Sequence, residues 1–519
     1  MKLNLSSSDI INTLKAINSS RKSYQSIFVH IPLLPISGKI SNLAWVDERF
    51  WKGIIDALNQ NGVLWCCTNT SPTLEGLDVF PLELAVRLQA LGLCTRNVVL
   101  WYNSEYPNCS VMFKNRATYV LFVTKDAREY KFSVDAVREP HIWRDYEWGG
   151  GRRSRYHPLG KNPSNFWLRT KSKAGKILMH VPLTWSEMAK RCLQTCTQEG
   201  DEVLGIVPRN RDFVAVCKEL NLEYQIVALP VENREYETGA RTCHNIQNQH
   251  QFIEASNGPT IHLPRIYFKS SESMVELKEG EAQVIVTSPP YWGLRDYGVK
   301  DQIGFDESYS RYLSRLEAVW LECHRILNNS GTLWININKR MINGKILLFP
   351  VDVIKSCNRV GFKLQDIVIW FRAISVPGSG EKNFTDRYEF ILVFSKKDEF
   401  KFYPQRIDDK DFLNEEKGDL INVWKLYRMI GNLNEEFGAK TKLAIKHTAM
   451  FPEELVRRVV LLCSDEGETV LDPFLGSGTT VAVATKLGRN SVGYEINEAF
   501  KPLVQKKLRD ATESLSRFL

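Results

Sequence analysis

The sequence predicts an α/β protein with two domains in tandem, each a mostly parallel sheet flanked by helices. Three observations lead to this fold class. Short β-rich runs alternate with helical patterns in the second half of the chain, the same succession of segments recurs in the first half, and a polar, aperiodic stretch separates the two. Such alternation is typical of parallel strands joined by crossover helices that cover both faces of a sheet.

An internal repeat sets the domain organisation. Segments of the first half match segments of the second at a nearly constant offset: NGVLW (61–65) and SGTLW (330–334), FPLELAVRLQALG (80–92) and FPVDVIKSCNRVG (349–361), NVVLW (97–101) and DIVIW (366–370), YVLFVTK (119–125) and FILVFSK (390–396), EGDEVL (199–204) and EGETVL (466–471). Chance similarity does not keep register for so long, so the pattern indicates a duplicated domain. The expected boundaries are a lead at 1–22, a first domain at 23–232, a linker at 233–262 and a second domain at 263–519.

The elements of the second domain follow from local patterns. Runs rich in Val, Ile, Leu and aromatic residues predict buried strands at 282–288, 332–337, 367–371, 390–395, 469–474 and 491–496. Between several of them, apolar residues recur at helical spacing, which predicts helices at 308–327 and 452–463. The matching segments of the first domain predict the same order there.

Composition narrows the class of protein. The chain has 519 residues, of which 43% are apolar and 25% charged, as in ordinary globular proteins. Its net charge of +8 is compatible with a polyanionic partner. The N-terminus lacks a signal-peptide core, no apolar run approaches the roughly 20 residues of a membrane span, and the 11 cysteines show no CxxC spacing. We therefore expect a cytoplasmic protein with reduced thiols, no membrane association and no metal site.

The stretch VLDPFLGSGTT (470–480) joins a predicted strand to a predicted helix. Gly476 and Gly478 allow a ligand to approach the backbone closely, and the free N–H groups at the helix start favour an anionic group. About 20 residues later, Glu495 follows the next strand, where a carboxylate can bind two ribose hydroxyls. Together they predict a nucleotide-like cofactor site, although a glycine loop alone is also compatible with a plain strand-to-helix turn.

The stretch TSPPYWG (287–293) follows the strand at 282–288. Its two prolines fix a rigid extended corner whose carbonyl oxygens can point outward as acceptors. Ser288 can accept a hydrogen bond and Tyr291 offers an aromatic face. The corner therefore suits an amino group held against an aromatic ring, with a structural turn as the alternative.

In combination, TSPPYWG, DPFLGSGTT and VGYEIN resemble the amino DNA methyltransferases that use S-adenosylmethionine, in the order of their β class. RYEFILVFSK (387–396) and HTAMFPEELVRR (447–458) lie where that class has further motif blocks. The resemblance implies a Rossmann-like methyltransferase fold for each domain. It assigns cofactor contacts to Thr287, Asp472, Pro473, Phe474, Gly476, Ser477, Gly478, Thr479 and Glu495. It assigns catalysis to Ser288, Pro289, Pro290 and Tyr291.

One departure concerns the residues ahead of the catalytic strand. Relatives often carry Gly-Asp there, whereas this chain reads IYFKSSESM (266–274). Glu272 is the candidate acidic contact to the adenine end of the cofactor in its place.

The resemblance also implies a substrate and partners. A base flipped out of double-stranded DNA would stack on Tyr291 and receive the methyl group by direct displacement. Ser-Pro-Pro favours cytosine N4 as the target, with adenine N6 as the alternative. We expect a restriction–modification context with a cognate restriction endonuclease. The alternative of another class is a non-catalytic DNA-binding protein made of decayed domains, and the loops alone leave RNA open as a substrate.

The first domain lacks both functional loops. VLGIVPRNRDFVAV (203–216) has Gly205 in place of Asp472, and Arg209, Asn210 and Arg211 in place of the residues at 476–478. At the catalytic corner, Ile31, Leu33 and Leu34 are aligned with Ser288, Pro290 and Tyr291. We therefore expect a first domain that binds no cofactor and mimics a second subunit, so that the protein is a monomer acting as an intramolecular pseudo-dimer.

Two segments are candidates for DNA contact. In the first domain, residues 141–162 interleave aromatic residues with Arg144, Arg152, Arg153 and Arg155 around three glycines. Arginines suit phosphates and guanine edges, although a solvated basic loop has the same composition. In the second domain, the charged region 397–446 is the candidate for base recognition by its position between the motif blocks.

Overall fold

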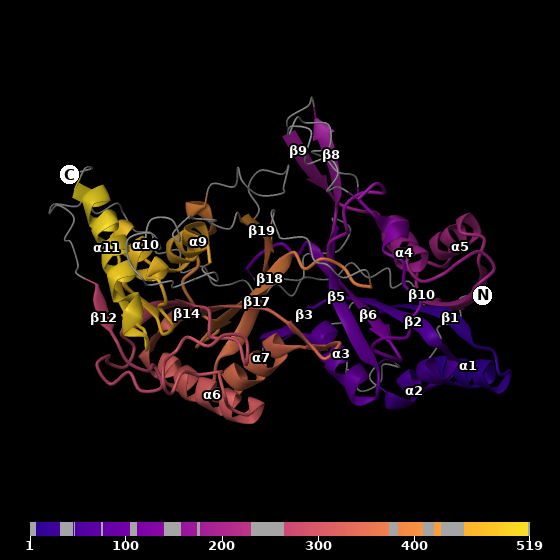
Figure 1. The fold of residues 1–519 in the computed structure, drawn as a ribbon, viewed down its shortest axis with the longest axis horizontal. Coiled ribbons are helices and arrows are strands. Elements are labelled where there is room, and N and C mark those ends of the chain that lie inside the picture. The colour runs from indigo at the N-terminus through magenta and orange to yellow at the C-terminus, as the bar shows by residue number, and fades with distance from the viewer. Residues whose placement is uncertain are drawn as a thin grey trace.

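The computed structural model describes residues 7–31, 45, 47–73, 76–103, 112–139, 157–173, 177–229, 264–372, 382–407, 420–426 and 451–516. Two α/β halves lie side by side, the N-terminal half in indigo to magenta and the C-terminal half in red to yellow (Figure 1). Each contains a mostly parallel sheet with helices packed on it, so the predicted fold class is confirmed.

The N-terminal half contains α1 (Ser7–Ser19), β1 (Tyr24–His30), α2 (Glu48–Ala57), β2 (Leu58–Thr68), β3 (Ser71–Thr73), β4 (Gly76–Asp78), α3 (Phe80–Ala90), β5 (Cys94–Tyr102), β6 (Ala117–Thr124), the 3-10 turn η3 (Asp135–Val137), β7 (Phe166–Trp167), β8 (Arg169–Lys173), β9 (Ile177–Val181), α4 (Trp185–Gln194), β10 (Glu202–Val207), α5 (Asn210–Glu219) and β11 (Glu223–Ala228). All seven residues of β1 are buried, as expected of a central strand covered on both faces. Thr184 and Glu187 form a reciprocal capping box that starts α4.

The C-terminal half contains β12 (Arg265–Tyr267), β13 (Ala282–Thr287), α6 (Tyr309–Ile326), β14 (Leu327–Ile337), β15 (Arg340–Ile342), β16 (Lys345–Leu347), α7 (Phe349–Val360), β17 (Lys363–Arg372), β18 (Tyr388–Ser395), the 3-10 turn η5 (Pro404–Arg406), β19 (Val423–Leu426), α9 (Glu453–Cys463), β20 (Thr469–Asp472), α10 (Thr479–Lys486), β21 (Asn490–Tyr494), η7 (Glu498–Phe500) and α11 (Lys501–Ser516). Ser308 caps α6 by accepting a hydrogen bond from the amide of Arg311. Gly361, at φ 110°, ends α7 in the left-handed conformation.

The two sheets share one strand order. In the N-terminal half it is β11-β10-β1-β2-β6-β5-β7, and in the C-terminal half β21-β20-β13-β14-β18-β17-β19 with β12 added at the edge. The register agrees as well, because Ile27 lies between Leu64 and Leu204 just as Ile285 lies between Leu333 and Leu471. Only β6 and β18 run antiparallel to their neighbours in these sheets.

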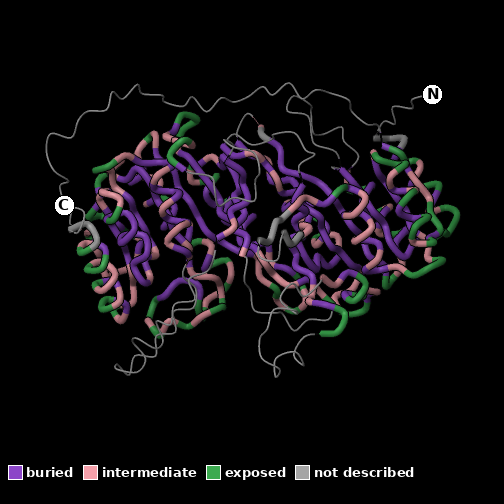
Figure 2. Tube along the Cα trace, turned by 90° about the horizontal axis from the view of Figure 1, so that it is seen from above, coloured by how far each residue is buried: buried purple, intermediate pink, exposed green. Residues whose placement is uncertain are grey.

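The halves meet through a reciprocal exchange of aromatic side chains. Phe113 of the first half packs on Trp334, Phe402 and Trp424 of the second, with ring centroids 5.4–6.3 Å apart. Phe384 of the second half packs on Trp65, Phe132 and Trp167 of the first, at 5.4–6.4 Å. Buried chain runs through the junction without interruption (Figure 2), so the two halves share a continuous apolar core. Among the described residues, no helix has the length and apolar character to cross a membrane.

Candidate active site

A cavity of about 410 Å³ opens in the C-terminal half, beyond the carboxyl ends of β13, β14, β20 and β21. Two loops reach it from adjacent strands, one after β13 and one after β20, where the connections leave in opposite directions. Ligands of open α/β sheets bind at such a switch point. Ten of the residues assigned from sequence line the cavity: Ser288, Pro289, Pro290, Tyr291, Pro473, Phe474, Gly476, Ser477, Thr479 and Glu495.

Thr287 and Asp472 lie beneath the cavity and tie the two loops together. The Asp472 carboxylate accepts hydrogen bonds from the hydroxyls of Thr287 (2.8 Å) and Thr480 (2.6 Å) and from the amide of Phe474 (3.0 Å). Burial raises the pKa of Asp472 to about 6. These two residues therefore position the loops, and neither is among the residues that line the cavity.

The glycine loop adopts conformations that require its glycines. Gly476 has φ 54° and Gly478 has φ 84°, both in the left-handed region. Gly478 is also the residue before α10, and a Cβ there would lie 3.3 Å from Val504. The loop therefore turns sharply into the helix, as predicted, and Gly478 serves this turn beside the cavity.

Glu495 carries the carboxylate at the cofactor side of the cavity. Its oxygens accept hydrogen bonds from the amides of Gly476 and Asn497, both at 2.8 Å. Burial raises the pKa of Glu495 to about 7, and the nearby Asp472 adds to the shift. A buried carboxylate that already orders the glycine loop can also accept hydrogen bonds from the hydroxyls of a bound ribose.

Lys507 on α11 was not found from the sequence. Its ammonium group donates hydrogen bonds to the hydroxyls of Ser477 (2.9 Å) and Thr479 (2.8 Å), and burial lowers its pKa to about 8. It thus holds the glycine loop from behind. No local signal marks it, because it is one lysine among several on an amphipathic helix after the last motif.

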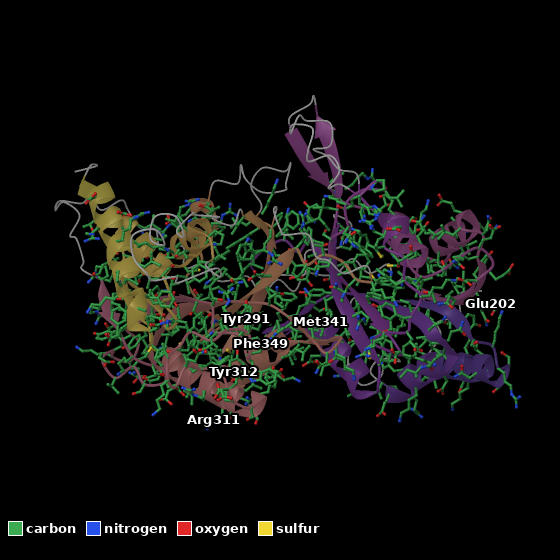
Figure 3. All side chains as sticks on the ribbon, viewed as in Figure 1. Glu202, Tyr291, Arg311, Tyr312, Met341 and Phe349 are labelled. Atoms are coloured by element: carbon green, nitrogen blue, oxygen red, sulfur yellow. The ribbon has the colours of Figure 1, made fainter. Side chains whose placement is uncertain are left out.

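The catalytic corner is braced from three sides. The Tyr312 hydroxyl donates to the carbonyl of Pro290 at 2.8 Å, Arg340 donates to the carbonyls of Trp292 and Gly293, and the Trp292 indole donates to the carbonyl of Glu307 at 2.8 Å. The ring of Tyr291 meets Phe349 edge to face at 6.1 Å, and these rings lie close to Tyr312 above α6 (Figure 3). The corner is therefore held rigid while Ser288 and Tyr291 face the cavity.

A network of charged side chains also reaches the cavity, and the sequence did not reveal it. Asp386 accepts hydrogen bonds from Lys339 and Arg372, both at 2.8 Å, and Arg372 lies 3.4 Å from Glu389. Lys339, Arg372 and Glu389 line the cavity. Burial disfavours the ionised carboxyl, but the two cations hold the pKa of Asp386 down at about 2. These residues come from the ends of β14, β17 and β18, so only the sheet brings them together.

Two sequence assignments need correction. Glu272, the candidate contact to the adenine end, forms an ion pair with Arg315 at 2.6 Å and does not line the cavity, whereas Lys269, Ser270 and Ser271 do. The aligned position of Ile31 was wrong by one residue. Since Ile27 has the register of Ile285, the residue equivalent to Ser288 is His30.

His30 is buried in the N-terminal half and accepts a hydrogen bond from the Trp185 indole at 2.9 Å. Burial lowers its pKa to about 3, with the nearby Arg209 adding to the shift, so it stays neutral. Ile31 then corresponds to Pro289, while Leu33 and Leu34 lie outside the described residues.

The cofactor loop of the N-terminal half is replaced by regular structure. β10 continues to Val207 and α5 begins at Asn210, so two residues join them where six join β20 to α10. A Cβ on Gly205 would come within 2.4 Å of the Phe213 ring. Phe213 occupies the position equivalent to Thr480, as Gly205 occupies that of Asp472. The space of the Asp472 carboxylate is thus filled by an aromatic ring.

The candidate DNA contacts are not placed. Arg144, Arg152, Arg153 and Arg155 lie outside the described residues, as do the linker at 233–262 and most of 397–446. Among the residues that the structure does describe, no group of three or more His, Cys, Asp or Glu side chains is arranged to hold a metal ion.

Several known proteins are similar to this chain. A family model described as DNA methylase, whose name covers N6 and N4 enzymes, matches residues 282–506. The chain is 30% identical over 270 residues to the type II methyltransferase M.Cfr9I of Citrobacter freundii, covering 46% of this chain and 86% of that relative. It is 32% identical over 253 residues to the type II methyltransferase M.SmaI of Serratia marcescens, covering 43% and 83%. Similar solved structures include the PvuII DNA methyltransferase (cytosine-N4-specific), with 18% identity, a TM-score of 0.41 and coverage of 50% of this chain and 93% of that one. Another is the M1.HpyAVI–SAM complex, with 17% identity, a TM-score of 0.33 and coverage of 47% and 100%.

Proposed function

The chain belongs to the family of S-adenosylmethionine-dependent DNA methylases, and within it we propose that the protein methylates the exocyclic N4 of a cytosine flipped out of double-stranded DNA. One observation carries the proposal. The TSPPY corner and the glycine loop, which are far apart in the sequence, open into the same cavity and are joined beneath it through Thr287 and Asp472.

The cavity fits the cofactor. Its volume of about 410 Å³ lies within the ordinary range for small-molecule sites. Phe474 offers an apolar face, the Glu495 carboxylate suits the ribose hydroxyls, and Lys269 to Ser271 lie at the same end of the site as Tyr494 and Glu495 through the pairing of β12 with β21. When bound there, the cofactor supplies an electrophilic methyl group on its sulfonium.

The catalytic corner activates the target amine. The lone pair of an exocyclic amino nitrogen is delocalised into the ring, and acceptors on its hydrogens draw it toward tetrahedral geometry. Ser288 Oγ and the Pro289 carbonyl are the acceptors, while the Tyr291 ring stacks on the base. With the cofactor bound, these two acceptors would orient the amine nitrogen toward the methyl group that the sulfonium supplies, and the proton that the nitrogen loses on methylation would leave to solvent. No covalent enzyme intermediate forms.

The mouth of the cavity suits entry of a base from DNA. Leu294 and Met341 are 48% and 42% exposed there, and Arg295 and Arg340 lie next to them in sequence and also line the cavity. Exposed apolar side chains beside cations fit a nucleic acid whose base stack is opened. Figure 3 places Met341 on the side of the site that faces the N-terminal half.

The choice of cytosine over adenine rests on Ser288, since Ser-Pro-Pro is mostly found with cytosine targets; adenine N6 remains the alternative. Incubating the full chain with S-adenosylmethionine and defined duplexes, then digesting to nucleosides for mass spectrometry, tests the proposal. N4-methylcytosine is expected. N6-methyladenine would overturn the base assignment, and a methylated RNA but no methylated DNA would overturn the substrate.

The same assay separates an enzyme from a DNA-binding protein made of decayed domains. Ser288→Ala and Tyr291→Ala should each retain folding and cofactor binding and lose at least about 100-fold in kcat. Equal DNA binding by wild type and variants, with no methyl transfer by any, would favour the binding protein.

We also propose how the halves arose and act. The shared strand order and register support duplication of one domain, with boundaries near 23–232 and 263–519. The reciprocal junction supports a monomer that acts as an intramolecular pseudo-dimer with one active site. Relatives named type II methyltransferases support a restriction–modification context with a cognate endonuclease. Sedimentation of the purified chain tests the pseudo-dimer, for which a single-chain mass is expected.

A further inference from the structure

We propose that Asn165, a residue of the N-terminal half, is a positioning residue for the active site of the C-terminal half. The inference rests on the proposed function, because it assigns a role within that site. It gives the N-terminal half a defined task in the reaction without any catalytic group of its own.

Both polar atoms of the Asn165 side chain form hydrogen bonds with residues of the C-terminal half. It is fully buried, just before β7. Its amide group donates to Asp386 Oδ1 at 2.8 Å, and its carbonyl oxygen accepts from the backbone amide of Arg387 at 2.9 Å. Its own backbone amide donates to the carbonyl of Thr385 at 2.9 Å. Three consecutive residues ahead of β18 are thus held by one residue of the other half.

Asp386 connects Asn165 to the residues that line the cavity. Besides Asn165, its carboxylate accepts from Lys339 and Arg372, and from the Asn338 amide at 3.0 Å. Arg372 in turn lies 3.4 Å from Glu389, whose second carboxylate oxygen accepts from Asn336 at 3.2 Å. Four donors therefore set the orientation of the Asp386 carboxylate, and Asn165 is the one that comes from the other half. The bond from Asn165 therefore helps to set where Lys339 and Arg372 stand in the cavity.

These groups lie on the Tyr291 side of the cavity, because β14, β18 and β17 continue the sheet from β13 in the direction away from β20 and its glycine loop. Burial raises the pKa of the Tyr291 hydroxyl well above its ordinary value, the Glu389 carboxylate adds to the rise, and Arg372 opposes it, which places both charges near the tyrosine. Loss of the Asn165 contact should consequently disturb the base and the transfer step, and leave cofactor binding unchanged.

The opposite side of the junction provides an internal comparison. Asn422 of the C-terminal half donates to Asn115 at 3.2 Å and accepts from the backbone amide of Arg116 at 2.9 Å, which is the contact of Asn165 with the halves exchanged. Even the backbone bridges match, Ser164 with Thr385 and Lys114 with Ile421.

The two sides of the junction differ in the charge of the residues that surround each asparagine. At the positions equivalent to the charged network, the N-terminal half has neutral residues: Asn115 for Asp386, Asn103 for Arg372, Thr118 for Glu389 and Thr70 for Lys339. Asn103 donates to Thr118 at 2.7 Å, so the bonded pattern persists without charge. The junction contact therefore exists on both sides, but Asn165 leads to ionised groups that line a cavity, whereas the side-chain partner of Asn422 is the neutral Asn115.

The test compares Asn165→Ala with its matched control Asn422→Ala in the full chain. Each variant removes one buried asparagine from the same kind of interface, so the two should lose similar thermal stability. Asn165→Ala should lower kcat about 10- to 100-fold while the Kd for S-adenosylmethionine stays within about twofold, since small misplacements at a reacting centre have effects of this size. Asn422→Ala should keep kcat within about twofold of wild type.

A double-mutant cycle with Asp386→Ala isolates the route. If Asn165 acts through Asp386, Asn165→Ala should cause little further loss of kcat in the Asp386→Ala background. Independent, multiplicative losses would overturn the route, and equal kcat values for the two asparagine variants would overturn the positioning role. Should Asn165→Ala fail to fold, Asn165→Ser, which is too short to reach Asp386, gives the same comparison. A wild type that transfers no methyl group to any DNA would instead refute the proposed function.

Discussion

The connection after β20 and the connection after β10 begin from the same strand position and end in equivalent helices, but only the first leaves room for a ligand. After β20, six residues with two left-handed glycines turn beside a buried carboxylate. After β10, the strand and the helix each extend into the loop, and Phe213 fills the carboxylate's space. A fold can thus keep its sheet and core while a site disappears, because the core depends on apolar registers and the site on a few loop residues.

The largest effect is expected from Gly476→Arg, which gives the loop after β20 the arginine that stands at the equivalent position, Arg209, after β10. In Gly476→Arg, the new side chain enters the cavity from a left-handed backbone position and displaces the loop from Glu495. S-adenosylmethionine binding should weaken at least about 100-fold, measured by isothermal titration. The reverse change, Arg209→Gly, should create no binding, since Phe213 still fills the site; micromolar binding there would contradict this account.

The next comparison concerns the charged network. Arg372→Asn gives the C-terminal half the residue that Asn103 provides in the N-terminal half, and leaves Asp386 and Glu389 without their shared cation. We expect kcat to fall by about 100-fold with the Kd of the cofactor nearly unchanged, because a preorganised charge at the base is lost. Single-turnover kinetics measure this. A change confined to cofactor affinity would show that the network faces the other ligand.

A double exchange tests the packing beneath the loops. Thr480→Phe removes a 2.6 Å hydrogen bond to the buried Asp472 and forces a ring against it, which should lower the free energy of unfolding by about 2–4 kcal/mol. Adding Asp472→Gly restores the pair found in the N-terminal half as Gly205 and Phe213. Denaturant unfolding should show most of the stability regained, whereas cofactor binding stays lost. No recovery would mean that the two halves pack differently there.

How much of this site could be found from sequence depended on where the information lies. The glycine and proline residues of both loops are local signals, since backbone geometry demands them, and the structure brings these loops together. Lys507 and the network around Asp386 could not be found, because they belong to α11 and to strand ends that meet only in the folded sheet. Asn165 lies further still, in the other half of the chain.

The alignment of Ile31 with Ser288 failed for a related reason. Both corners contain prolines, and matching sequence letters allows a shift of one residue. The hydrogen-bonded register of β1 between β2 and β10 does not allow that shift, because moving by one residue would turn every side chain of the strand to the other face. The hydrogen-bonded register of a buried strand therefore identifies equivalent residues where a sequence alignment allows a shift by one position.

The smallest expected effect is the pH dependence that Glu495 gives to the C-terminal half. Burial raises the pKa of Glu495 to about 7, whereas the N-terminal half has Ala228 in that register. Because the folded state holds this proton more tightly than the unfolded chain, Glu495 should lower the stability of the cofactor-free protein as pH rises from about 4.5 to 7.

Cofactor affinity should change in the opposite direction, rising a few-fold between pH 6 and 8 as the carboxylate ionises and becomes the stronger acceptor for ribose hydroxyls. Isothermal titration across this range measures the affinity. Glu495→Ala, which reproduces the residue of the N-terminal half, should bind weakly and without this slope. A wild-type affinity that is flat from pH 6 to 8 would mean that Glu495 is already ionised, or that it does not contact the cofactor.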